Sequence, residues 1–197
     1  RQMCRRYRKV TNAAVILVGK KDIINSKYPQ AKISLEYRTG ESNIHFDARE
    51  FFDGPYYIMI DKLWAAINSR NGSVPVRNGI YKDYDIPLFN EDVIREALNN
   101  AIAHRAYDIQ GEIVVKQYPT QMIFVNPGGF PHGVTIDNIL YVQSTPRNRL
   151  LADVLSKTGL VERSGQGVDN IFLDTLSEGK PAPDYSKTDD FCVTLIL

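Results

Sequence analysis

Two glycine-containing segments have the composition of loops that hold a phosphorylated ligand. Gly128 and Gly129 closely follow Asn126 at the end of an expected strand, and Gly165 and Gly167 stand immediately before an expected helix. Glycines let the backbone approach a ligand closely, and the N-terminus of a helix presents free N–H groups to phosphate. An ordinary turn and an ordinary helix start have the same composition, so each segment alone leaves both interpretations open. The chain contains no Walker A motif, with its lysine after the glycines.

A polar stripe is predicted along one helix of the chain. Glu96, Asn100 and His104 are spaced four residues apart, so in a helix they lie on the same side, at the edge of an apolar face. An amide or imidazole at such an edge costs roughly 1–3 kcal/mol unless it finds hydrogen-bond partners. The neighbouring Asn99 lowers the helix propensity further. The stripe is either part of a site or a set of ordinary polar residues that neighbouring loops satisfy.

Hydrophobic periodicity and turn residues predict the elements that would position these side chains. Asn90 is a suitable N-cap, and Glu91 and Asp92 place negative charge where the helix dipole favours it. Apolar runs and apolar–polar alternation indicate strands. The expected helices are 58–67, 90–105, 149–157 and 168–176, and the expected strands are 13–18, 31–38, 43–46, 111–117, 121–125 and 191–197.

These elements predict an α/β (α+β) fold built as a two-layer sandwich, in which the last three helices cover a mixed or antiparallel sheet. Turn formers fill residues 71–88 and predict a boundary there, between an N-terminal connecting α/β subdomain at 1–88 and a C-terminal domain at 89–197. The N-terminal portion either forms a small subdomain of its own or packs on the same sheet.

The composition excludes several classes of protein. With 24 Lys and Arg against 23 Asp and Glu, the net charge is +1, which excludes nucleic-acid binding through bulk positive charge alone. Cys4 and Cys192 lie at opposite ends of the chain, which excludes a disulfide scaffold and a zinc cluster. No apolar run approaches the roughly 18 residues that span a bilayer. A cytoplasmic protein without a membrane partner is therefore expected.

The N-terminal end of the chain raises two further expectations. Residues 1–9 carry five positive charges, and such a run is either a phosphate-contacting arm that binds DNA or a solvated linker. A first residue of Arg1 rather than Met indicates a partial chain.

Four motifs, in the same order along the chain, resemble a known bacterial family. They are residues 95–107 (REALNNAIAHRAY), 126–133 (NPGGFPHG), 147–148 (RN) and 160–168 (LVERSGQGV). Over about residues 10–197, the chain resembles the C-terminal ATPase-like domain of transcriptional regulators that carry an N-terminal Schlafen/AlbA-type DNA-binding domain. Members are often labelled RecG-like ATP-dependent DNA helicases, and the domain is similar to the GHKL ATPase fold of gyrase, Hsp90 and histidine kinases.

The resemblance implies that ATP and Mg²⁺ are the ligands of the domain at 89–197. It assigns the magnesium ion to Asn100 and a catalytic role, the orientation of an attacking water, to Glu96, and it places His104 near the phosphates. The other matched positions, which receive the adenine and wrap the phosphates, are Asn126, Gly128, Gly129, Gly165 and Gly167.

Departures from the family pattern leave two functions open. The adenine loop usually begins with an aspartate, whereas Asn126 offers only an uncharged acceptor, which makes a weaker hydrogen bond. A helicase motor needs a Walker A lysine and a second acidic motif, and the chain has neither. The leading hypothesis is a nucleotide-binding regulatory domain, with weak ATPase activity left open, of a regulator that contacts DNA through a domain outside this chain. The alternative is a degenerate, non-catalytic scaffold that mediates homodimerisation.

Overall fold

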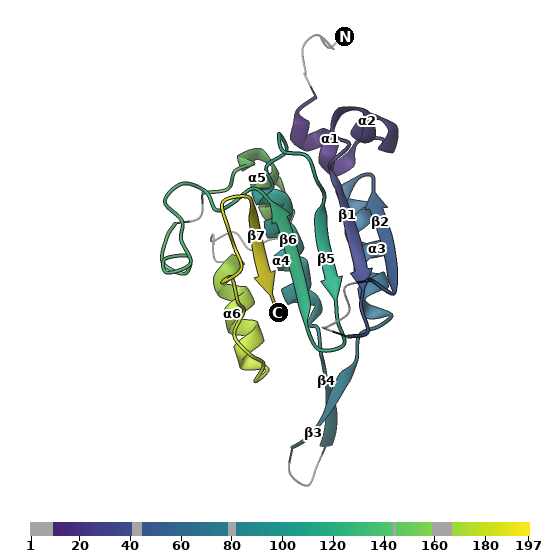
Figure 1. The fold of residues 1–197 in the computed structure, drawn as a ribbon, viewed down its shortest axis with the longest axis vertical. Coiled ribbons are helices and arrows are strands. Elements are labelled where there is room, and N and C mark those ends of the chain that lie inside the picture. The colour runs from purple at the N-terminus through teal and green to yellow at the C-terminus, as the bar shows by residue number, and fades with distance from the viewer. Residues whose placement is uncertain (1–9, 41–44, 79–81, 144, 159–166) are drawn as a thin grey trace, which may run out of the picture.

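A mixed five-stranded sheet organises the computed structural model, which describes residues 10–40, 45–78, 82–143, 145–158 and 167–197 (Figure 1). The strand order is β2-β1-β5-β6-β7, in which β1 and β5 are parallel and the other neighbours are antiparallel. The strands are β1 (Lys32–Tyr37), β2 (Ala48–Asp53), β5 (Ile113–Gln117), β6 (Met122–Pro127) and β7 (Cys192–Ile196). Because β1 pairs with β5, the N-terminal portion packs on the same sheet as the C-terminal portion.

Helices cover one face of this sheet. In Figure 1, α3 and α4 lie behind the strands, and α6 lies beside the β7 edge. The helices are α1 (Asn12–Val18), α2 (Lys21–Lys27), α3 (Tyr56–Asn68), α4 (Glu91–His104), α5 (Arg149–Lys157) and α6 (Gly167–Ser177). A separate hairpin, β3 (Ser73–Asn78) with β4 (Lys82–Pro87), extends away from the body at the bottom of the view. The arrangement is the mixed α+β fold that the sequence predicts.

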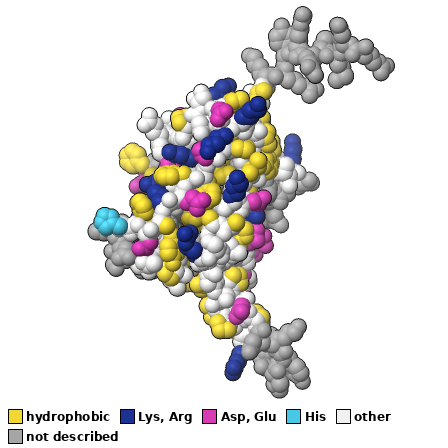
Figure 2. All heavy atoms as spheres, turned by 90° about the vertical axis from the view of Figure 1, so that its right-hand side faces the viewer, with side chains coloured by type: hydrophobic (Ala, Val, Ile, Leu, Met, Phe, Trp, Pro, Cys, Tyr) yellow, Lys and Arg dark blue, Asp and Glu magenta, His cyan; other side chains and the backbone are white. Residues whose placement is uncertain are grey.

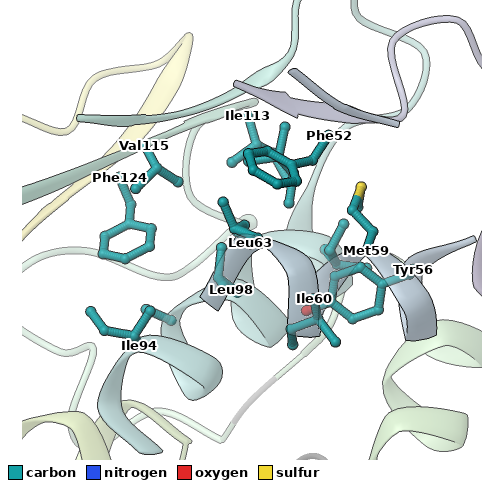
Figure 3. Packing of buried hydrophobic residues seen from close by; sticks show 14 of the residues in the cluster. Phe52, Tyr56, Met59, Ile60, Leu63, Ile94, Leu98, Ile113, Val115 and Phe124 are labelled. Carbon is teal, nitrogen blue, oxygen red and sulfur yellow. The ribbon is translucent and has the colours of Figure 1, made fainter. Parts of the chain in front are cut away.

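The main core lies between α3, α4 and the sheet. Leu63 of α3 and Leu98 of α4 point toward Ile113 and Phe124 of the sheet, whereas the Tyr56 ring of α3 is directed toward α4 (Figure 3). All five side chains are buried. The Tyr56 hydroxyl donates to Asn99 Oδ1 at 2.8 Å, so the polar Asn99 side chain joins the two helices inside the core. Burial raises the pKa of Tyr56 well above its ordinary value, which keeps this hydroxyl a donor.

The sequence predicts α4 correctly from its first turn to its last. Asn90 is the N-cap, and its side chain accepts a hydrogen bond from the Asp92 N–H at 2.8 Å. Glu91 and Asp92 occupy the first turn and His104 the last, as the helix dipole favours. The predicted elements that the structure also confirms are those at 31–38, 58–67, 111–117, 121–125, 149–157, 168–176 and 191–197.

The strand predicted at 13–18 is wrong, because these residues form α1. The Thr11 side chain caps this helix by accepting a hydrogen bond from the Ala14 N–H at 3.2 Å. A short apolar run has the same appearance in a buried strand and in a buried helix, so periodicity alone could not separate them. The sequence also gave no indication of α2.

Of the strand predicted at 43–46, residues 45 and 46 lie outside any strand and precede β2, which begins at Ala48. Residues 43 and 44 lie outside the described residues. Asp47 closes the turn between the two strands: its Oδ2 accepts from the Thr39 N–H at 2.6 Å, and its own N–H donates to the Tyr37 carbonyl. The turn-rich segment 71–88 contains the β3–β4 hairpin, whose strands the sequence analysis did not identify.

Two other observations concern the chain as a whole. None of the helices formed by the described residues has the length and apolar character needed to cross a membrane. The basic segment 1–9, considered as a DNA-binding arm, lies outside the described residues.

Truncation of Leu98 tests the core described above. Leu98→Ala should lower the free energy of unfolding by about 2–5 kcal/mol, because the side chain is 0% exposed and its loss leaves a cavity between α4 and the sheet. Leu173→Ala is a matched control on α6, where the side chain is 64% exposed, and its effect should stay within about 0.5 kcal/mol. Urea unfolding of both variants measures the difference, and equal effects would contradict this placement of the core.

Candidate functional site

A cavity of about 310 Å³ opens beside α4, between the β6–β7 end of the sheet, α5 and the start of α6. Its floor and walls are mainly apolar, with Phe124 and Leu195 from the sheet, Ile171 from α6 and Ile139 from the segment that follows β6. The polar groups that line it include Asn100, His104, Asn126, Ser156 and Tyr185. An apolar cavity with a few converging polar groups is the usual form of a small-molecule site.

The N-terminus of α6 packs directly on the polar stripe of α4. A Cβ atom at Gly167 would lie 2.1 Å from Glu96 Oε1 and 3.1 Å from Asn100 Nδ2, so a side chain there would require the Glu96 carboxylate to move. Asn100 Nδ2 in turn donates to Glu96 Oε1 at 3.3 Å. The glycine therefore permits the close approach of two helices, and this contact fixes Glu96 and Asn100 at one end of the cavity.

Asn126 holds its side-chain amide in one orientation. Its Nδ2 donates to the Ala101 carbonyl of α4 at 3.0 Å, which places the nitrogen toward the helix. Its Oδ1 is buried and has no hydrogen-bond partner among the described residues. The side chain is 6% exposed, and an acceptor buried without a partner costs free energy. Asn126 therefore lines the cavity and carries a fixed, buried acceptor that has no partner among the described residues.

The segment after β6 runs close to the backbone of its neighbours. Gly128 has φ +97°, in the region that favours glycine, and a Cβ atom there would lie 2.7 Å from Ala106 Cβ. A Cβ atom at Gly129 would lie 2.8 Å from the carbonyl oxygens of Asp189 and Asp190. Both glycines are required because other chain segments occupy the space that a side chain would need.

Arg147 and Asn148 hold this segment against the C-terminal end of α4. Arg147 donates to the His104 carbonyl at 3.2 Å and to the Gly129 carbonyl at 2.8 Å. Asn148 Nδ2 donates to the carbonyls of Ala103 at 3.1 Å and Arg105 at 2.7 Å. The last carbonyls of a helix lack partners within the helix, and these two side chains supply them. The motif at 147–148 thus has a structural function that its sequence alone did not reveal.

His104 is an uncharged donor or acceptor at neutral pH. Burial, together with the nearby Arg147 guanidinium, lowers the pKa of His104 from 6.5 to about 4. A neutral imidazole can form hydrogen bonds with a ligand in the cavity, but it does not contribute positive charge to it.

The structure brings together most of the residues that the sequence singled out. Asn100, His104, Asn126, Gly129 and Gly167 all line the same cavity. Glu96 contacts Asn100 and Gly167 but is not part of the lining, and Gly128 lines a neighbouring surface depression instead. Gly165 lies outside the described residues. The catalytic, cofactor-binding and metal-binding roles of these positions remain predictions.

Two aromatic side chains at the cavity, Tyr185 and Phe130, were not among the predicted site residues, although Phe130 lies within the motif at 126–133. Their ring centroids are 6.1 Å apart, and Tyr185 also stacks on Phe172 of α6 at 6.4 Å. Burial raises the pKa of the Tyr185 hydroxyl, and the Glu96 carboxylate adds to that shift. No local signal marks Tyr185, because it lies between α6 and β7 in a segment without periodicity.

A substitution at Gly167 tests the contact between α6 and α4. Gly167→Ala should lower the free energy of unfolding by about 1–3 kcal/mol, because the added methyl group overlaps the Glu96 carboxylate. Alanine otherwise favours a helix over glycine. In a double-mutant cycle with Glu96→Ala, the cost of Gly167→Ala should become smaller, and urea unfolding measures each corner of the cycle. Equal costs in both backgrounds would show that Glu96 does not limit the approach of α6.

The pH dependence of stability tests the environment of His104. Between pH 6.5 and about 4, His104 binds a proton in the unfolded chain but not in the folded chain. The free energy of unfolding should therefore fall as the pH drops from 6.5 to about 4. His104→Gln should remove this contribution and reduce the slope, measured by urea unfolding at a series of pH values. His132→Gln, in an exposed loop, is the control, and a slope that His104→Gln leaves unchanged would contradict the shift.

Comparisons with known proteins agree with this fold. Residues 110–195 match the family described as "Putative ATP-dependent DNA helicase recG C-terminal". The chain is similar to the solved DIP2311 protein of Corynebacterium diphtheriae, with a TM-score of 0.73 and 26% sequence identity. This similarity covers 84% of the present chain and 34% of the solved chain, which is therefore much longer than the matched part. No curated protein matches the chain.

The family match contains Asn126 and both glycine segments, whereas Glu96, Asn100 and His104 precede it. The resemblance expected from the four sequence motifs is thus confirmed for the recG-type domain. The C-terminal part of this chain, residues 110–195, is therefore similar to the recG C-terminal, ATPase-like domains.

Proposed function

We propose that the cavity beside α4 binds an adenine nucleotide, and that this domain regulates a larger protein through the bound state. The observation that carries the proposal is the buried, unsatisfied acceptor of Asn126, a residue that lines an apolar cavity. An adenine ring presents an amino group and two apolar faces, which match a buried acceptor between apolar walls.

The orientation of Asn126 supports adenine recognition without the aspartate that is usual in such loops. An aspartate here would place a carboxylate oxygen against the Ala101 carbonyl, which now receives a hydrogen bond from Asn126 Nδ2. An asparagine satisfies that carbonyl and still leaves Oδ1 free to accept from an amino group. The departure from the family pattern is therefore compatible with binding of the base.

The residues at the other end of the cavity fit a nucleotide that carries Mg²⁺. The described residues contain no group of three or more His, Cys, Asp or Glu side chains that could hold a metal ion alone. Mg²⁺ commonly binds through one or two protein oxygens and the phosphates of its nucleotide. Asn100, beside Glu96, would supply the protein oxygen, and Glu96 would hold a water molecule by hydrogen bonding. Bound ATP would supply a hydrolysable phosphoanhydride.

The charges around the cavity support dependence on Mg²⁺. Asp153 and Asp169 are the charged side chains in the described lining, and His104 is neutral at pH 7. Two carboxylates disfavour a free triphosphate, so a divalent cation that neutralises the phosphates should strengthen binding. Hydrolysis requires, in addition, a water molecule held by Glu96.

The wider role that we propose is regulation of a DNA-associated protein. The family is described by its similarity to the C-terminal part of recG, and the solved relative is longer than the matched part. The net charge of +1 favours contact with DNA through another domain rather than through this one. Helicase activity is not proposed, because the chain lacks a Walker A motif. The cavity favours nucleotide binding over the alternative of a scaffold whose pocket is filled.

Calorimetric titration with ATP and with inosine triphosphate tests the proposal. Inosine has a carbonyl group where adenine has its amino group, so it would oppose Asn126 Oδ1 with a second acceptor. With Mg²⁺ present, the chain should prefer ATP over inosine triphosphate by about tenfold or more. Asn126→Leu should remove this preference, and chelation of Mg²⁺ should weaken ATP binding to the unmodified chain.

Unfolding curves of Asn126→Leu provide the control for correct folding. Absence of any heat with ATP and Mg²⁺ would refute nucleotide binding. An unchanged preference for ATP in a folded Asn126→Leu variant would refute the assignment of the base contact to Asn126.

A further inference from the structure

Strand β2 forms a free edge of the five-stranded sheet. It pairs with β1 on one side, and no described strand pairs with it on the other. In Figure 1 it is the outermost strand on the right, and Figure 2 looks directly onto that side of the molecule. Side chains of both charges lie there among hydrophobic ones. A free, regular edge strand is a template for pairing with another strand.

The hydrogen bonds of β1 show which backbone groups of β2 point outward. The Tyr37 carbonyl of β1 accepts from Asp47, at the β2 side, whereas the next residue, Arg38, donates to Gln117 at the β5 side. Odd-numbered residues of β1 therefore bond to β2, and their partners in β2 are even-numbered, as in the pair Leu35 and Glu50. The N–H and C=O groups of Arg49 and Phe51 consequently point away from the sheet.

The side chains of these outward residues lie on the face of the sheet that the helices do not cover. Phe51 is 53% exposed, although it lies over Ser34 of β1 and has the Arg49 guanidinium 4.8 Å from its ring centroid. Arg49 pairs with Glu112, which immediately precedes β5, and Asp53 pairs with Lys21 at 2.7 Å. The edge thus presents a large exposed aromatic ring between a basic and an acidic residue.

The sequence of β2 is self-complementary in one antiparallel register. Pairing two copies about Phe51 places Phe51 opposite Phe51 and Arg49 opposite Asp53, and it uses the outward backbone groups of all three residues. A shift to pairing about Glu50 would place Glu50 opposite Glu50, and like charges directly opposite each other are unfavourable. A shift in the other direction would lose the contact between arginine and aspartate.

We propose that this chain forms a homodimer through antiparallel pairing of β2 about Phe51. The two five-stranded sheets become one continuous sheet across a two-fold axis. The interface lies at the β2 edge, whereas the cavity lies toward β7 at the other end of the sheet. Dimerisation therefore leaves the proposed nucleotide site accessible in both copies.

Sedimentation velocity over a concentration series tests the interface in the 197-residue chain. The unmodified chain should form a dimer as its concentration rises. Phe51→Lys should raise the dissociation constant of this dimer by about tenfold or more. The substitution removes the pair of aromatic rings and places two lysines opposite each other at the two-fold axis. Phe46→Lys is the matched control. Phe46 is 45% exposed and also contacts Arg49, but it precedes β2 and lies outside the proposed pairing.

A second pair of variants does not depend on the folding of Phe51→Lys. In a chain with Cys4 and Cys192 replaced by serine, Phe51→Cys should form a disulfide-linked dimer on mild oxidation, because paired strands bring the two Cα atoms within disulfide range. Phe46→Cys should not form this dimer. A monomeric unmodified chain, equal effects of the two lysine variants, or equal cross-linking at both positions would overturn the proposal.

Discussion

The packing of α4 against the sheet determines where every group around the cavity lies. One side of this helix is buried in the core, and its polar edge meets the N-terminus of α6 and the end of β6. A rotation of α4 that improved the contacts of Leu98 would displace Asn100 and the Ala101 carbonyl as well. The apolar core therefore supplies the rigidity with which the polar groups are held, in agreement with the close packing of protein interiors.

The C-terminal end of α4 depends on residues that follow it by about forty positions in the chain. Arg147 donates to the His104 carbonyl, and Asn148 Nδ2 donates to the Ala103 carbonyl. The Arg147 guanidinium donates hydrogen bonds to the carbonyls of His104 and Gly129. Burial lowers the pKa of His104, and the positive charge of Arg147 adds to that shift. The same arginine thus holds the glycine segment in place and helps to keep the adjacent imidazole neutral, which couples the shape of the cavity to its charge.

Several site residues were predictable because their signals are local. The N-cap of α4, the four-residue spacing of Glu96, Asn100 and His104, and the close succession of Asn126 and Gly129 are visible in the chain itself. The segment at 13–18 and the strand after β1 were not predictable in the same way. A short apolar run lacks the length to distinguish helix from strand, and the position of β2 depends on a turn closed by the Asp47 side chain.

The sequence by itself determined the mixed α+β class, the extent of α4 and several of the residues that line the cavity, because helix periodicity, capping and glycine placement act over a few neighbouring residues. Only the tertiary structure decided that β1 joins β5, that the Glu96 carboxylate lies where a side chain at Gly167 would go, and that Asn126 retains an acceptor without a partner among the described residues. Those features arise from contacts between segments far apart in the chain. The free energies of these contacts depend on interatomic distances that no local sequence pattern specifies.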